Sequence, residues 1–185
     1  MVERFDDSDM KIVGSAPSKA EEPRDNETVN LYEEQKQNGN IAKAQRVGAT
    51  LAGDIDALSV ECEAALPSDD MLAVQKKLLM IFSFVAGIEE FSPNKLIVRT
   101  TLNVFYDTLK KEDPALYESM GLTGAFSFYY LEYRRSGDAT ANIANAFAML
   151  CGAESDSAYV ETGSAVFEKY YSFVKELIAQ VEYAN

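Results

Sequence analysis

The apolar run at residues 78–88, LLMIFSFVAGI, constrains the fold more than any other stretch of the chain. A helix made from this run is hydrophobic on nearly every side, and a helix of that kind is buried. The run is too short to cross a lipid bilayer, and Lys76 and Lys77 precede it. It therefore predicts a central helix over residues 71–91 in the core of a soluble protein, which the other segments must cover.

Apolar residues spaced three and four apart, the spacing of one helix face, recur along most of the chain. The clearest case is residues 41–66, where they form a seam typical of a helix that packs in a bundle. The members of this seam are Ile41, Ala44, Gly48, Leu51, Ile55, Leu58, Cys62 and Ala65. Because Ala44 and Gly48 are small, we expect a neighbouring helix to approach closely there.

The same spacing predicts helices elsewhere, and we find no alternating pattern or hairpin signal that predicts strands. Helices are expected at 27–37, 41–66, 71–91, 93–111, 114–120, 125–135, 139–150 and 157–183. Residues 1–25 are polar, contain proline and glycine, and are expected to form a flexible acidic tail. The predicted fold is a single-domain, all-α bundle of about seven or eight helices over residues 26–185.

Local signals mark several of these helix ends. Ser92 followed by Pro93 predicts an N-cap and a first helical residue, and Asp113 followed by Pro114 repeats the signal. In residues 125–135 the aromatic side chains surround the helix, which predicts a largely buried element.

Histidine is absent, which excludes His-based zinc sites, Ser-His-Asp catalysis and Glu-x-x-His di-iron sites. The two cysteines, Cys62 and Cys151, lie in apolar helical patterns and predict no disulfide framework. The carboxylate pairs are too sparse for a calcium loop. We therefore expect no metal and no cofactor.

The net charge of −13 disfavours nucleic acid and anionic membranes as partners, because their phosphates repel such a field. The first ten residues are acidic and lack the apolar segment of a signal peptide, so the expected location is the cytoplasm.

Two short patterns resemble enzyme motifs, but each has a simpler interpretation. Ser92 and Lys95 fit the Ser-x-x-Lys spacing of acylating enzymes, whose companion motifs are missing. Tyr106 and Lys110 have the Tyr-x-x-x-Lys spacing of some reductases, but the glycine-rich turn of a dinucleotide fold is absent. Ser92 is explained as the start of a helix, and Tyr106 and Lys110 as neighbours one turn apart on a helix. An enzyme is therefore not the favoured interpretation.

Two functional hypotheses remain open. The first is a non-enzymatic interaction or regulatory protein that binds a protein partner, or a second copy of itself, through helical faces. The second is a small-molecule-binding protein or unusual enzyme with a Tyr- and Arg-lined pocket between helices. The residues expected to line that pocket are Tyr129, Tyr130, Tyr133, Arg134 and Arg135.

The first hypothesis also predicts an interface. The apolar stripe of residues 159–181 is longer than a compact domain of this size needs, so its end is expected to need cover. A two-fold partner would supply it, which predicts a homodimer. The alternative is cover by residues 27–37 and the N-terminal tail of the same chain. The residues expected to be shared are Val174, Leu177, Ile178 and Val181.

Overall fold

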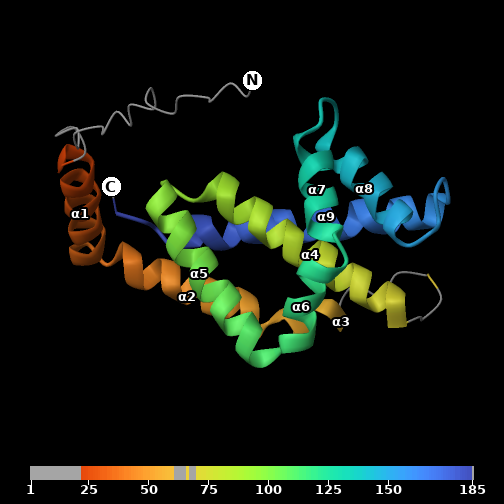
Figure 1. Cartoon of the computed structure of the whole chain (residues 1–185), viewed down its shortest axis with the longest axis horizontal. Helices are drawn as coiled ribbons and strands as arrows, with labels where there is room; N and C mark the ends of the chain where they lie inside the picture. Colours follow the sequence, from red (N-terminus) through yellow and green to blue (C-terminus); the bar gives the residue numbers. More distant parts are fainter. Residues whose placement is uncertain (1–21, 61–65, 67–69, 185) are drawn as a thin grey trace, which may run out of the picture. The chain divides into compact units, whose positions relative to one another are not determined.

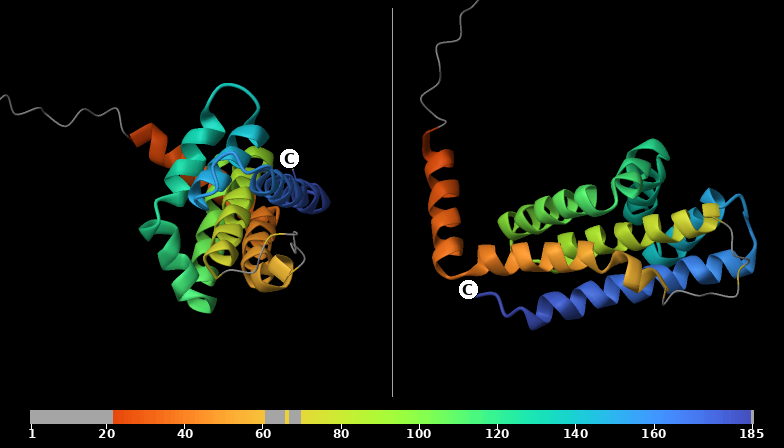
Figure 2. Two further views of the ribbon diagram at one scale, coloured as in Figure 1. Left: turned by 90° about the vertical axis from the view of Figure 1, so that its right-hand side faces the viewer. Right: turned by 90° about the horizontal axis from the view of Figure 1, so that it is seen from below.

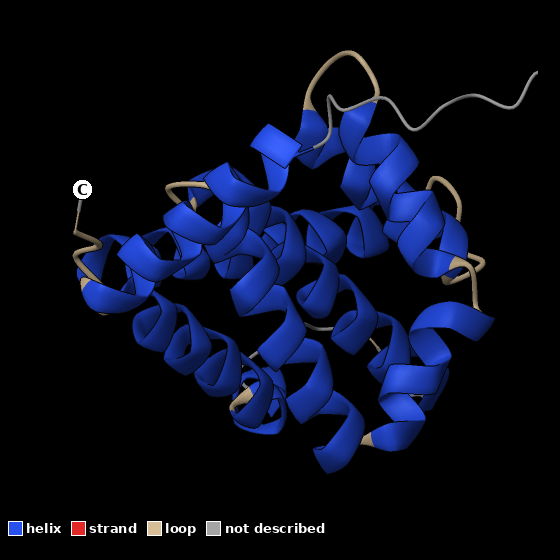
Figure 3. Cartoon of the chain, turned by 60° about the vertical axis from the view of Figure 1, so that its left-hand side comes forward, coloured by secondary structure: helices blue, strands red, loops and turns tan. Residues whose placement is uncertain are grey.

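The computed structural model describes residues 22–60, 66 and 70–184, and within them it contains nine helices and no strand (Figure 3). The helices are α1 (Glu22–Gln37), α2 (Asn40–Gly53), α3 (Ile55–Val60), α4 (Asp70–Phe91), α5 (Lys95–Glu112), α6 (Pro114–Leu122), α7 (Ala125–Arg134), α8 (Ala139–Leu150) and α9 (Ser157–Gln180). The predicted all-α fold is confirmed.

The chain divides into two compact units, residues 1–34 and residues 35–185. The first unit contains most of α1, where residues 29–34 are all exposed. The predicted boundary at residue 25 falls inside this helix, which begins at Glu22, earlier than the sequence pattern indicated. The rest of the predicted tail, residues 1–21, lies outside the described residues.

The second unit is built around α4, as the apolar run predicts (Figure 1). Every residue from Leu78 to Ile88 is buried, and α4 packs against α5, α7 and, most extensively, α9. By length and apolarity α4 could also span a membrane, but 72% of its most apolar window is buried inside the chain. The burial of residues 78–88 on all sides is typical of a core helix.

The contact between α2 and α5 depends on Gly48. A Cβ atom at this position would collide with the carbonyl oxygen of Thr101 and lie 3.1 Å from the backbone nitrogen of Phe105. The predicted close approach of a neighbouring helix is therefore confirmed, and α5 is that neighbour. The predicted helix over 41–66 is interrupted at Asp54, where α2 ends and α3 begins. Cys62 and Ala65 lie outside the described residues.

Two helix ends differ from the sequence prediction. The N-cap of α5 is Asn94, whose side-chain oxygen accepts hydrogen bonds from the backbone N–H groups of Leu96 and Ile97 at 3.0 Å; it is not Ser92. The predicted cap at Asp113 is confirmed by its bond to the Leu116 N–H.

The last helix, α9, is the long blue helix of Figure 2, and it ends at Gln180 instead of continuing to residue 183. The chain then leaves the helix, and the buried side chain of Asn40 holds the backbone of Ala184. The Asn40 amide nitrogen donates to the Ala184 carbonyl at 2.7 Å, and the Ala184 N–H donates back to the Asn40 amide oxygen at 2.9 Å. This pairing fixes the C-terminal segment, residues 181–184, against the start of α2.

Candidate binding groove

A groove runs over the surface of the second unit where α4, α5, α6 and α7 meet. It consists of two adjoining cavities of about 470 and 510 Å³, both open to solvent. The first is lined by Tyr106, Tyr117, Glu118, Met120, Gly121, Phe126 and Ser127. The second is lined by Val85, Glu89, Tyr106, Phe126, Ser127, Tyr130 and Leu131. Because Tyr106, Phe126 and Ser127 line both cavities, we treat them as one surface, the tyrosine groove.

The centre of the tyrosine groove is Tyr106 on α5. Its neighbour Phe105 is fully buried and points into the core, and this fixes the face of α5 on which Tyr106 lies. Partial burial, with Glu89 and Tyr117 close by, raises the pKa of the Tyr106 phenol to about 12. The phenol is therefore neutral at physiological pH and available as a hydrogen-bond donor.

The charges that line the tyrosine groove are all negative. Glu89 and Glu118 are exposed carboxylates, and no lysine or arginine is among the described residues that line either cavity. Cations from neighbouring positions lie over two of its rings. Lys110 is 5.7 Å from the centre of the Tyr117 ring, and Arg134 is 4.6 Å from the centre of the Tyr130 ring. These contacts indicate that the ring faces here attract positive charge.

The apolar part of the tyrosine groove has a fixed floor and an exposed rim. Val85 is buried at the floor, and Phe126 packs edge-to-face on the core residue Phe82, with ring centres 5.8 Å apart. Leu131 forms part of the rim and is 68% exposed. An exposed leucine beside aromatic side chains and carboxylates is the kind of surface that binds an amphipathic partner.

The five residues of the predicted Tyr/Arg pocket face different directions around α7, and the described contacts do not bring all of them to one site. Tyr129 is fully buried against Phe82, and its hydroxyl has no hydrogen-bond partner among the described residues. Burial raises the pKa of this phenol, with a further contribution from Cys151. Tyr133 faces α9, where its hydroxyl lies 3.3 Å from that of Tyr171.

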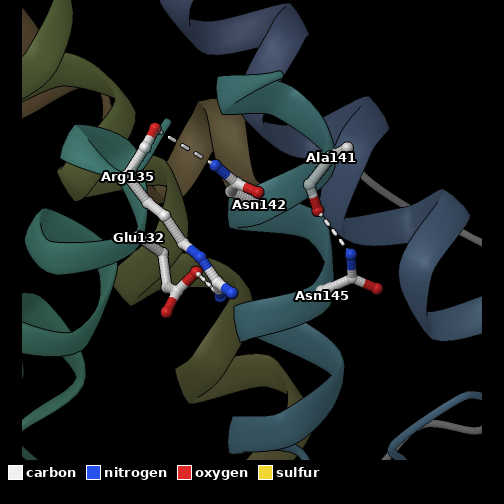
Figure 4. A network of polar contacts seen from close by, with 5 residues as sticks. All are labelled: Glu132, Arg135, Ala141, Asn142 and Asn145. Carbon is white, nitrogen blue, oxygen red and sulfur yellow. Dashed lines mark hydrogen bonds and ion pairs between the residues drawn. The ribbon is translucent and has the colours of Figure 1, made fainter. Parts of the chain in front are cut away.

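Only Tyr130 of the five lines the tyrosine groove. Arg134 covers the ring of Tyr130, and Arg135 is at the turn between α7 and α8 (Figure 4). There the Arg135 guanidinium lies 3.2 Å from the Glu132 carboxylate, and its carbonyl accepts a bond from the Asn142 side chain. Both arginines are exposed, so they do not form a buried anion site.

The structure separates the four predicted interface residues into two pairs. Val174 and Ile178 are buried within the chain, and Val174 packs directly over Gly87 of α4. A partner could reach them only if α9 moved away from α4. Leu177 and Val181 are partly exposed and line a different cavity, between α2 and α9. The homodimer itself stays a prediction.

The structure also places the side chains of the two spacings that resemble enzyme motifs. The Ser92 hydroxyl is buried and makes no hydrogen bond within the described part of the chain, to Lys95 or otherwise. Lys110 lies over the Tyr117 ring. Burial raises the pKa of the Cys151 thiol to about 11, which leaves little reactive thiolate at neutral pH. Among the described residues, no group of three or more metal-ligating side chains comes together.

No family model, curated protein or solved structure matches this chain.

Only Tyr130 of the groove residues is among the predicted ligand-binding residues, and Tyr106 was interpreted only as a helix neighbour of Lys110. Glu89, Tyr106, Tyr117 and Phe126 come from four different helices, and no local motif connects them. One usable signal was present in the sequence. Leu131 lies on the opposite side of its helix from the core residue Tyr129, and an apolar residue in that position marks an exposed apolar face.

Proposed function

We propose that this protein is a non-enzymatic interaction protein that holds a basic amphipathic helix of a partner protein in the tyrosine groove. One observation carries the proposal: the groove combines apolar and aromatic side chains with two exposed carboxylates, and none of its described lining residues is a lysine or arginine. A ligand that is apolar on one face and positively charged along its flanks complements both features.

Binding of a helix in a groove uses apolar anchors spaced three and four apart on the bound helix. In the tyrosine groove, Leu131, Phe126 and Met120 offer apolar surface for such anchors. Glu89 and Glu118 lie among these residues, where lysine or arginine side chains of the partner can reach them. The neutral Tyr106 phenol adds a hydrogen-bond donor at the centre.

Electrostatic steering supports the same class of partner. The chain has a net charge of −13, so its long-range field attracts a basic segment before the groove is reached. Complementary charge of this kind increases association rates and selects against acidic partners. The partner is therefore expected to be a basic protein segment, and nucleic acid is not expected to bind.

The proposal can be tested by fluorescence, because the chain contains no tryptophan. The probe is a designed peptide of roughly 16 residues with leucines at helical spacing, one tryptophan on the apolar face and lysines on both flanks. A second peptide replaces every lysine by glutamate. We expect the basic peptide to bind with a blue shift of its tryptophan emission, and the acidic peptide not to bind.

Variants of the protein assign the binding to the groove. Leu131→Asn replaces the exposed apolar side chain by a neutral polar one and should weaken binding of the basic peptide by about tenfold or more, since it removes an apolar anchor without changing the charge. Glu176→Gln changes an exposed carboxylate on α9 and should leave binding unchanged. If the basic peptide binds wild type and Leu131→Asn equally, the groove is not its site. If a small organic cation such as tetraethylammonium binds while the peptide does not, the groove is a small-molecule site instead.

A further inference from the structure

A third cavity, of about 320 Å³, lies between α2 and α9 and has the opposite chemical character. It is lined by Lys43, Arg46, Val47, Thr50, Leu177, Gln180 and Val181. All four polar side chains in this set can donate a hydrogen bond, and none is a carboxylate. This composition is unusual for a chain with 30 acidic residues. Helix α2 has no acidic residue anywhere along its length.

The two cations of this cavity lie on one face of α2, because residues three apart on a helix are neighbours. The Lys43 ammonium donates to the carbonyl oxygen of Glu182 at 2.8 Å, which holds it beside the cavity. An ammonium group has three donors, so two remain for a ligand. Arg46 is exposed and forms no ion pair with any described residue, so its guanidinium fork is available for a carboxylate.

The C-terminal segment keeps Lys43 in this position. Asn40 holds the backbone of Ala184 through two hydrogen bonds, and the Tyr183 side chain packs on the small cluster formed by Ile41, Ala44 and Ile97. These contacts fix the segment that supplies the Glu182 carbonyl. The Lys43 ammonium is therefore placed before any ligand arrives, which lowers the entropic cost of binding.

The remaining part of the cavity is apolar. Val47 is only 3% exposed, and the partly exposed Leu177 and Val181 lie on the α9 side. A polyanion such as a nucleic acid would gain little from this apolar surface and would be repelled by the net charge of the chain. A singly charged ligand with an apolar chain would satisfy both parts of the cavity.

We infer that the cavity between α2 and α9 binds a small monocarboxylate with a short apolar chain. The carboxylate binds between Lys43 and Arg46, and the chain packs on Val47, Leu177 and Val181. This site is independent of the tyrosine groove, because the two share no lining residue.

The test is an NMR titration of the full-length, ¹⁵N-labelled protein with sodium hexanoate at constant ionic strength. Acetate, which has the charge without the chain, and hexan-1-ol, which has the chain without the charge, are the matched ligands. We expect saturable shifts at α2 and the end of α9, with hexanoate binding about tenfold or more tightly than either control. Equal affinity for acetate or for hexan-1-ol would overturn the inference, as would shifts located elsewhere.

Three variants complete the test. Arg46→Gln removes an exposed side chain that takes no part in holding the C-terminal segment, so the fold should remain intact. The affinity for hexanoate should fall by about fivefold or more. Lys43→Gln should lower the affinity for hexanoate by a similar factor. Lys111→Gln, an exposed cation in the last turn of α5, is the control and should have no effect. Wild-type affinity in Arg46→Gln, with an unchanged spectrum elsewhere, would refute the site.

Discussion

Replacement of Gly48 by alanine should destabilise the protein, although alanine favours helices more than glycine does. The added methyl group would collide with the carbonyl oxygen of Thr101 and lie 3.1 Å from the backbone nitrogen of Phe105. Both atoms belong to the backbone of α5 and cannot move aside as a flexible side chain could. The two helices must therefore separate, and α5 also carries Tyr106 of the tyrosine groove.

The size of the effect follows from two opposing contributions. Overpacking of a tight contact costs about 1–3 kcal/mol, and replacing a helical glycine by alanine returns up to about 1 kcal/mol. Because the collision is with backbone, we expect a net loss of about 1–2 kcal/mol in the free energy of unfolding. For a chain of this size, each kcal/mol lowers the melting temperature by about 2–4 °C.

The assay is urea unfolding followed by circular dichroism at the helical band, with Gly53→Ala as the matched control. Gly53 ends the same helix, but a methyl group there would meet only the Glu112 carboxylate oxygen at 3.8 Å, an ordinary contact. The control should be as stable as wild type or more stable. If Gly48→Ala were as stable as Gly53→Ala, the close packing of α2 on α5 would be wrong.

Two further outcomes are expected. Between pH 10 and pH 12 the stability should fall, since the unfolded chain releases the Tyr106 proton at its ordinary pKa of 10.0 while the folded chain retains it to about 12. This contribution is at most about 3 kcal/mol. In thermal melts at stepped pH, the stability of Tyr106→Phe should fall less steeply between pH 10 and pH 12 than that of wild type. An equally steep fall would mean that Tyr106 is not the group responsible. Asn40→Ala should cost about 1–3 kcal/mol, because it leaves buried polar groups unpaired, and it should speed amide exchange at Ala184. Unchanged exchange there would contradict the proposed fixing of the C-terminal segment. Asn103→Ala, at an exposed position of α5, is the control; it should leave exchange at Ala184 unchanged and should not lower the stability.

The features predicted correctly from the sequence are those set by local chemistry or by periodicity. The run of residues 78–88 is apolar on all sides, so it could be stable only in a core. The small Gly48 in the seam of residues 41–66 predicts a close helix contact, although the sequence does not identify the neighbouring helix. Asp113 followed by Pro114 specifies a helix start with little help from the rest of the fold.

Other boundaries depend on tertiary contacts. Ser92 and Asn94 are both competent N-caps two residues apart, and packing of the chain selects Asn94. The break at Asp54 follows a glycine, a weak helix former, although the apolar seam continues through it. Helix α7 is aromatic on every side, which predicted burial, but only Ala125 and Tyr129 are fully buried. Its other aromatic side chains are partly exposed, and some of them line the tyrosine groove.

The tyrosine groove could not have been predicted from sequence alone. Its carboxylates and aromatic rings are brought together only when α4, α5, α6 and α7 pack, and each is an ordinary exposed or half-buried residue within its own helix. The predicted site residues were instead selected by proximity in sequence along α7, where successive side chains point in different directions.

If the carboxylates of the tyrosine groove select a basic partner, reversing their charge tests that selection most directly. The double variant Glu89→Lys and Glu118→Lys changes the net charge from −13 to −9, because each substitution adds two units. The control Glu168→Lys and Glu176→Lys makes the same change on exposed positions of α9. Affinities for the basic and acidic peptides are then measured by tryptophan fluorescence at about 0.15 M salt, where distant charges are screened.

We predict that the affinity of the groove variant for the basic peptide falls by about tenfold or more and that the acidic peptide now binds, since charge complementarity sets partner choice. The α9 variant should keep the wild-type preference for the basic peptide. If both double variants change preference equally, net charge and not the groove selects the partner. If neither changes, the basic peptide does not bind at Glu89 and Glu118, and the proposed function is wrong.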